Sequence, residues 1–301
     1  MGGQTVRLTA DDGTELVAYH LGGDGPPVML THATGFHAHC WLPLASTLTP
    51  EFSVWALDQR GHGASGKAPD GQYPWSRFAA DLRFVLDELA TPGQPWRAGG
   101  HSMGGAVALM VEADRPGTFA AICAYEPVVF PDTGLPLEEG QAPPPLAVLA
   151  RKRRPSFESR AAALANYGSK PPLNQFDPEA LENYVEYGLV DAPDGTVTLA
   201  CVREDEGAVF DGAAGNGVWN RLDQVRCPVT VLAGGSGMDP VGRIAPAVAR
   251  QLPRGGYREF PALDHFGPMT APYEVGRVMA TALAGGHPPG AESTIAVTSP
   301  S

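Results

Sequence analysis

Short apolar runs bounded by turn residues alternate along the chain with longer stretches whose apolar residues recur every three or four positions. The first pattern predicts strands and the second predicts amphipathic helices. The expected strands are residues 15–21, 27–32, 52–58, 95–102, 120–126, 228–235 and 256–262. The expected helices are residues 41–48, 75–89, 104–116, 243–252 and 273–284. This alternation predicts an α/β fold: a mainly parallel central sheet with helices on both faces.

The alternation stops between about Pro131 and Asp223, where a proline-rich loop leads into helix-like pieces at 145–154, 157–167 and 178–187. We therefore expect a helical cap at 131–223, inserted between two parts of one core domain, residues 1–130 and 224–285. The small, polar residues 286–301 predict a disordered tail. The early run 15–21 precedes any helix and is expected to form an antiparallel edge strand.

The composition suits a large globular core and argues against a nucleic-acid partner. Of the 301 residues 43% are hydrophobic, and the formal net charge is -12. Phosphate binding needs clustered Lys and Arg, which this sequence mostly lacks. One basic run, residues 151–154, follows a helix-like segment, and we interpret it as a solvated helix end rather than a nuclear-targeting or polyanion-binding patch.

Neither the cysteines nor the apolar stretches indicate a secreted or membrane protein. No stretch approaches the ~18 apolar residues of a membrane span, and the first residues lack the order of a signal peptide. We therefore expect no membrane partner. The four cysteines are widely separated and suggest neither a disulfide framework nor a metal knuckle, so we expect reduced thiols and a cytoplasmic location: Cys40, Cys123, Cys201 and Cys227.

The segment "GGHSMGG" carries the pattern G-x-S-x-G at Gly100, Ser102 and Gly104, between an expected strand and an expected helix. A sharp strand-to-helix turn holds such a serine in strained backbone geometry, and the residues two before and two after it must be small. We therefore predict that Ser102 is a nucleophile.

A serine nucleophile needs a base, and the base needs an acid to orient it. The order for this architecture is Ser, then Asp or Glu, then His. His265, in a loop before the last helix, is the predicted base. Asp239, after the strand at 228–235, is the favoured acid. Glu126, at the end of the strand at 120–126, is the alternative acid, and Asp264 ranks last because it adjoins the histidine.

An acyl-transfer site also needs two backbone N–H groups for the developing oxyanion. One is expected from Met103, directly after the nucleophile. The other is expected from Thr34, in the loop that follows the strand at 27–32.

Two other patterns suggest ligands that the context excludes. The glycines of "DQRGHGASGKAPDG" fit both dinucleotide and P-loop spacings, but Pro69, Gly71 and Pro74 delay the next helix to about Trp75. A phosphate loop must feed directly into its helix, so no nucleotide cofactor is expected. His32, His37 and His39 crowd one loop without the spacings of hydrolytic metal motifs, so no metal is expected either.

The motifs "HATGF", "DQRGHGASG", "GHSMGG" and "DHFGP", in this order, resemble those of the α/β-hydrolase family, specifically its esterase-like members with a helical cap. The resemblance spans about Thr14 to Ala284 and excludes the cap. It implies that "DQRGHGASG" is a structural loop. Ala33 departs from the family's usual His-Gly pair.

Relatives that open epoxides or displace halide carry Asp at the elbow, so Ser102 implies acyl chemistry on a small molecule without a cofactor. The expected reaction is cleavage of an ester, lactone or thioester through an acyl-enzyme. A carbon-carbon bond hydrolase, a cofactor-free perhydrolase and a non-catalytic small-molecule receptor are the alternatives on the same fold.

Overall fold

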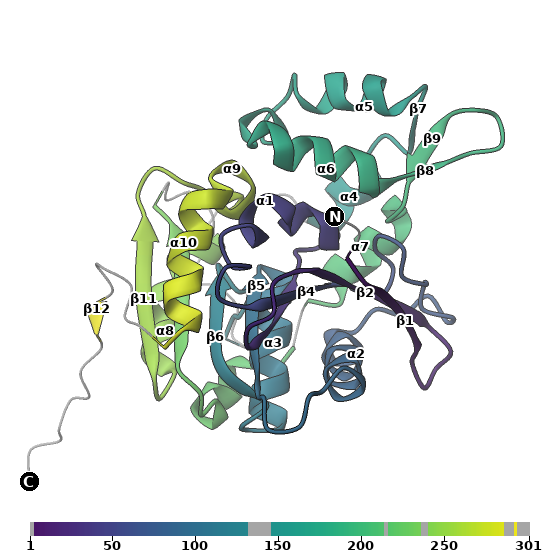
Figure 1. The fold of residues 1–301 in the computed structure, drawn as a ribbon. Helices are drawn as coiled ribbons and strands as arrows, with labels where there is room; N and C mark the ends of the chain where they lie inside the picture. The colour runs from purple at the N-terminus through teal and green to yellow at the C-terminus, as the bar shows by residue number, and fades with distance from the viewer. Residues whose placement is uncertain (1–2, 132–145, 214–215, 236–239, 286–291, 294–301) are drawn as a thin grey trace, which may run out of the picture.

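The computed structural model describes residues 3–131, 146–213, 216–235, 240–285 and 292–293. Within these residues nine strands form one sheet in the order β1-β2-β4-β3-β5-β6-β10-β11-β12 (Figure 1). The six strands from β4 to β11 run parallel, whereas β1, β2 and β12 pair antiparallel. The bounds are β1 Thr5–Thr9, β2 Glu15–Gly22, β3 Pro27–Thr31, β4 Ser53–Asp58, β5 Trp96–His101, β6 Phe119–Tyr125, β10 Val229–Gly234, β11 Gly255–Phe260 and β12 Glu292–Ser293.

Helices cover both faces of this sheet, which confirms the predicted fold class. One hydrophobic cluster packs three helices against one face: α2 (Trp75–Glu88), α3 (Met103–Asp114) and α8 (Pro240–Gln251). A second cluster packs α1 (Leu42–Ala45) and α10 (Pro272–Leu283) against the other. Nearly all of α3 is buried, because it lies between the sheet, α2 and the 3-10 helix η3 (Trp219–Gln224).

The antiparallel strand expected at 15–21 is β2, but it does not form the edge. β1 pairs outside it, with Thr5 opposite Tyr19 and Thr9 opposite Glu15. The sequence reading missed β1 because its apolar and polar residues alternate over only five positions. At the other end, Gly256 and Tyr257 of β11 pair with β12, and the rest of the tail expected at 286–301 lies outside the described residues.

The described elements between β6 and η3 are residues 146–211, which we call the inserted segment (Figure 1). Its short strands β7, β9 and β8 make a second, antiparallel sheet. Its α6 packs against α1 and the 3-10 helix η1 (Ala38–Trp41) of the core. The elements are α4 Leu146–Arg151, β7 Ser156–Phe157, α5 Arg160–Tyr167, η2 Leu173–Gln175, α6 Pro178–Gly188, β8 Leu189–Asp191, β9 Val197–Leu199 and α7 Arg203–Asp211.

No helix in the described part of the chain is long and apolar enough to cross a membrane.

Candidate active site

Ser102 lies at the junction of β5 and α3 in a strained conformation, with φ of 55°. Its neighbouring glycines are sterically required. A Cβ on Gly104 would lie 2.2 Å from the carbonyl oxygen of Thr31, and one on Gly100 would lie 2.6 Å from the Cα of Gly105. We call this cramped strand-to-helix turn, with Ser102 at its tip, the elbow.

Glu126 is the one other non-glycine residue with positive φ in the described ranges, at 42°. It follows β6 and is 1% exposed. Its Oε2 lies 2.6 Å from Nδ1 of His265, and its Oε1 accepts a hydrogen bond of 2.7 Å from the N–H of Gly234. The buried carboxylate accepts from the ring, so Nδ1 carries the proton and Nε2 carries the basic lone pair.

Hydrogen bonds at the ends of three parallel strands place these groups side by side. The N–H of Ser102 donates to the carbonyl of Tyr125, the residue before Glu126, at 2.9 Å, and the N–H of Glu126 donates to Leu232 at 2.8 Å. His101 lies 2.7 Å, through its Nε2, from the backbone oxygen of His265. The loop carrying His265 is thus attached directly beside Ser102.

The structure brings the alternative acid, Glu126, to His265. The favoured acid, Asp239, lies outside the described residues. Asp264, which ranked last, directs its Oδ1 to the N–H of Phe266 within its own loop, and its backbone oxygen accepts from the hydroxyl of Tyr125.

The loops that carry the two expected oxyanion donors are in contact. Thr34 Oγ1 lies 3.4 Å from Sδ of Met103, and Thr31 Oγ1 donates to the carbonyl of Gly104 at 3.0 Å. Met103 is the first residue of α3, so its N–H has no carbonyl partner four residues earlier within the helix. Ala33 is buried without a positive φ, so its methyl group is accommodated in the loop.

The loop after β4 braces the loop after β3 through His62. The N–H of Gly35 donates to Nε2 of His62 at 3.1 Å, while Nδ1 of the same ring lies 2.9 Å from the carbonyl of Arg60. The ring must therefore be neutral, with its proton on Nδ1. Burial lowers the pKa of His62 to about 4, which favours this form at neutral pH.

A second histidine, His32, also joins the loop after β3 to the loop after β4. Gln59 donates its backbone N–H to Nε2 of His32 at 3.0 Å and its side-chain amide to the His32 carbonyl at 2.7 Å. The glycine-rich motif is thus a structural loop, as the resemblance implies, and α2 begins at Trp75, as predicted. The sequence did not reveal the brace, because its partners are 27 residues apart.

Three phenylalanine rings adjoin the elbow and the His265 loop. Phe36, from the loop after β3, lies 6.1 Å from the ring of His101 and 6.2 Å from that of Phe266. Phe176, from the inserted segment, lies 5.7 Å from Phe266. An apolar wall therefore borders the site, with contributions from the core and the inserted segment.

The crowded histidines join the inserted segment to the core. His37 Nε2 lies 3.2 Å from the carbonyl of Tyr184, and burial lowers the pKa of His37 to about 3. His39 stacks on Tyr187 with ring centroids 3.8 Å apart. Across the described ranges no group of three or more His, Cys, Asp or Glu could hold a metal ion.

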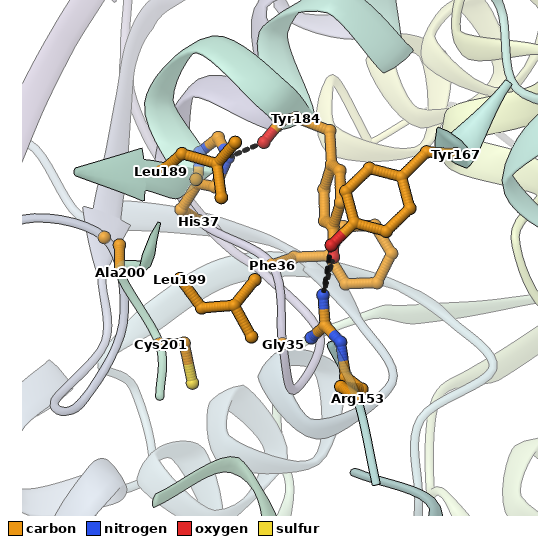
Figure 2. A pocket seen from close by; sticks show the side chains of 12 residues that line it. Gly35, Phe36, His37, Arg153, Tyr167, Tyr184, Leu189, Leu199, Ala200 and Cys201 are labelled. Atoms are coloured by element: carbon orange, nitrogen blue, oxygen red, sulfur yellow. Dashed lines mark hydrogen bonds between the residues drawn. The ribbon is translucent and has the colours of Figure 1, made fainter. Parts of the chain in front are cut away.

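A small cavity lies between the loop after β3 and the inserted segment (Figure 2). Its volume is about 10 Å³, enough for roughly one water molecule. Ser102 and His265 do not line it, but Phe36 does, and the Phe36 ring also contacts His101. The lining residues are Gly35, Phe36, His37, Gly63, Arg153, Tyr167, Tyr184, Gly188, Leu189, Leu199, Ala200 and Cys201.

Arg153 is the charged member of this lining, and the interpretation of 151–154 as a solvated helix end was wrong for it. The other three residues of the run are exposed, but Arg153 points inward and bonds to Glu206 Oε2 at 2.5 Å. Its Nη2 lies 2.7 Å from the hydroxyl of Tyr184 and 3.4 Å from that of Tyr167. Burial disfavours the charge, but these three neighbours hold the pKa of Arg153 well above its ordinary value.

Known proteins resemble this chain over most of its length. The sequence profile described as the alpha/beta hydrolase family matches residues 28–278. Fluoroacetate dehalogenase from a Burkholderia species is 26% identical over 252 residues, which cover 77% of this chain and 78% of that protein. Pimeloyl-[acyl-carrier protein] methyl ester esterase from Chromobacterium violaceum is 26% identical over 259 residues, or 81% of this chain and 88% of that protein.

Among solved structures, an E-2-(acetamidomethylene)succinate hydrolase superposes with a TM-score of 0.76, covering 93% of this chain and 100% of that one. Its sequence is 20% identical, so this likeness concerns the fold.

Proposed function

The chain belongs to the alpha/beta hydrolase family, and we propose that it is a serine hydrolase that cleaves an ester, lactone or thioester of a small, largely apolar molecule. The observation that carries this proposal is the attachment of His265 at two points: its ring to Glu126 and its backbone oxygen to His101, next to Ser102. A serine on a strained turn beside an oriented histidine is suited to nucleophilic acyl transfer.

In the proposed reaction Ser102 attacks the substrate carbonyl while Nε2 of His265 accepts the hydroxyl proton. The backbone N–H groups of Met103 and Thr34 stabilise the oxyanion of the tetrahedral intermediate. His265 then protonates the leaving group, and a water activated by the same ring releases the acid product. Glu126 keeps the proton on Nδ1 and stabilises the imidazolium as it forms.

Ser102 also separates this proposal from dehalogenation, the reaction in the name of the Burkholderia relative. The resemblance noted above implies an Asp at the elbow in halide-displacing members. Ester cleavage is named for the Chromobacterium relative, which matches a larger share of this chain.

We further propose that residues 131–223 act as the cap, with 1–130 and 224–285 as the core. Support comes from α6 packing on η1 and from Phe176, which contributes a ring to the wall beside His265. Substrate would lie between this cap and the elbow.

The test is turnover of a short p-nitrophenyl ester by the wild type and by Ser102→Ala. We expect the variant to lose several orders of magnitude in kcat, because the nucleophile and its base act as a unit. Ser169→Ala, an exposed serine of the inserted segment, is the matched control and should retain full activity. A fluorophosphonate probe should label Ser102 alone. Equal turnover by the wild type and Ser102→Ala would reject the enzyme in favour of the receptor.

A further inference from the structure

The cavity of Figure 2 is lined by one arginine and two phenol groups, together with apolar and backbone groups. The Arg153 guanidinium points toward the hydroxyls of Tyr167 and Tyr184. Because these hydroxyl oxygens accept from the arginine, each keeps its own proton to donate elsewhere. Burial raises the pKa of Tyr184, so that proton is retained at neutral pH.

Glu206 does not line the cavity, but it compensates the charge of Arg153 from behind through their ion pair. Its side chain is 7% exposed and that of Arg153 is 22% exposed. A Cβ on Gly35 would lie 2.6 Å from Glu206 Oε1 and 3.4 Å from Arg153 Nη1. The pair thus abuts the residue next to Thr34, close to the expected oxyanion loop.

We propose that this cavity, which we call the Arg153 subsite, binds an uncharged hydrogen-bond acceptor of the substrate, such as a ketone, ester or amide carbonyl, away from the scissile bond. The proposal rests on the proposed function. The volume admits one small polar group of about the size of a water. The apolar body of the substrate would lie along Phe36, which contacts both His101 and Tyr184.

The charge balance selects a neutral group over an anion. Arg153 alone would favour a carboxylate, since guanidinium and carboxylate form strong bidentate pairs. Here Glu206 already takes that place, and a second buried carboxylate beside it would meet like-charge repulsion and a desolvation cost. A carbonyl oxygen accepts from Tyr184 or Arg153 without adding charge.

The experiment uses matched p-nitrophenyl esters whose acyl chains end in methyl, methyl ketone or carboxylate. For the wild type we expect kcat/KM to favour the ketone over the methyl end by roughly 3- to 10-fold, the worth of one net hydrogen bond. The difference should reside in KM, because the subsite contacts substrate and transition state alike. The carboxylate should be the poorest of the three.

Variants then assign the preference to named groups. Arg153→Met should reduce the ketone-to-methyl ratio to about one, and Tyr184→Phe should reduce it while keeping the ring. Glu206→Gln leaves the arginine uncompensated and should shift the carboxylate-to-ketone ratio upward by roughly 10- to 100-fold. Arg151→Met removes an exposed ion pair with Asp211 from the same basic run and should leave every ratio as in the wild type.

A wild-type ketone-to-methyl ratio near one, or a ratio that survives both Arg153→Met and Tyr184→Phe, would overturn the subsite. So would an unchanged carboxylate-to-ketone ratio in Glu206→Gln. If Arg153→Met does not fold, Tyr184→Phe and Glu206→Gln decide. Failure of the proposed function has a different signature: no ester is turned over in a Ser102-dependent way. Calorimetry of the corresponding non-hydrolysable ethers with Ser102→Ala then tests the subsite by binding alone.

Discussion

Nδ1 of His265 and Oε2 of Glu126 lie 2.6 Å apart, although the two residues are separated by 139 positions in the chain. Glu126 is anchored from the other side by the N–H of Gly234, so its carboxylate has a fixed direction. This relationship decides which acid we assign to the histidine.

Replacing the Glu126 carboxylate by an amide should remove the group that orients His265, while the side chain keeps its size and shape. We expect Glu126→Gln to lower kcat by about 10⁴-fold, because an amide no longer stabilises the imidazolium and favours the wrong tautomer. Steady-state kinetics on a p-nitrophenyl ester measure the loss, and circular dichroism checks the fold. Asp239→Asn is the comparison and should stay near wild-type activity. The reverse result, an active Glu126→Gln and an inactive Asp239→Asn, would restore Asp239 as the acid.

The brace formed by His62 should act on turnover rather than on substrate affinity. His62→Gln keeps an acceptor for the N–H of Gly35, whereas His62→Phe removes it. We expect His62→Phe to lose roughly 10- to 100-fold in kcat, less than the 10²- to 10³-fold cost of deleting an oxyanion donor, with KM little changed. His62→Gln should recover much of the loss.

A boronic acid that mimics the tetrahedral intermediate provides the second readout for His62. Its affinity should fall in parallel with kcat/KM in His62→Phe. If only the melting temperature falls while kcat and boronate affinity stay at wild-type values, His62 serves stability alone.

The same ring predicts a pH dependence of the free energy of unfolding. The pKa of His62 is lowered by burial from 6.5 to about 4, so the unfolded chain binds the proton more readily between these values. Stability is therefore complete above about pH 6.5 and falls as the pH decreases toward 4, by up to roughly 3 kcal/mol from this group. Urea unfolding of the wild type and His62→Gln across this range should show a shallower decline for the variant. Parallel curves would contradict the assignment.

Buried charge supports the core near the brace. Arg60 bonds to Asp81 at 2.6 Å, with side chains 2% and 4% exposed. Arg60 also pairs with Asp12 at 2.8 Å, whereas Asp81 pairs with Arg60. Removing the arginine therefore leaves the buried Asp81 uncompensated, so Arg60→Met should lower the free energy of unfolding by about 3 to 5 kcal/mol. Asp70→Ala breaks the exposed pair with Arg77 and should cost far less, because solvent screens that pair. Equal losses in the two variants, measured by denaturant unfolding, would refute the distinction.

Features encoded within a few consecutive residues could be predicted from the sequence. The G-x-S-x-G turn is one, because its steric requirement involves only the flanking glycines and the adjacent strand and helix. The alternation of β5, α3 and β6 is another, since periodicity is a local property.

Features that depend on distant partners could not be predicted. The choice between Glu126 and Asp239 depends on how β6 and β10 end beside the His265 loop, which no local pattern records. Four consecutive basic residues likewise give no indication that Arg153 alone turns inward, because that depends on Glu206, which lies 53 residues away.

The hydrogen bond that joins the ends of β5 and β6 has a consequence for how the proposed activity is lost on warming. Ser102 and Glu126 are both fixed at the ends of central strands, and the N–H of Ser102 bonds to Tyr125. The imidazole, by contrast, comes from the connection after β11, which is held by separate contacts to His101, Tyr125 and Glu126 rather than by strand pairing. Connections of this kind open at lower cost than paired central strands. Warming should therefore abolish turnover reversibly, by displacing His265 from Ser102, at a temperature well below that at which the central strands separate.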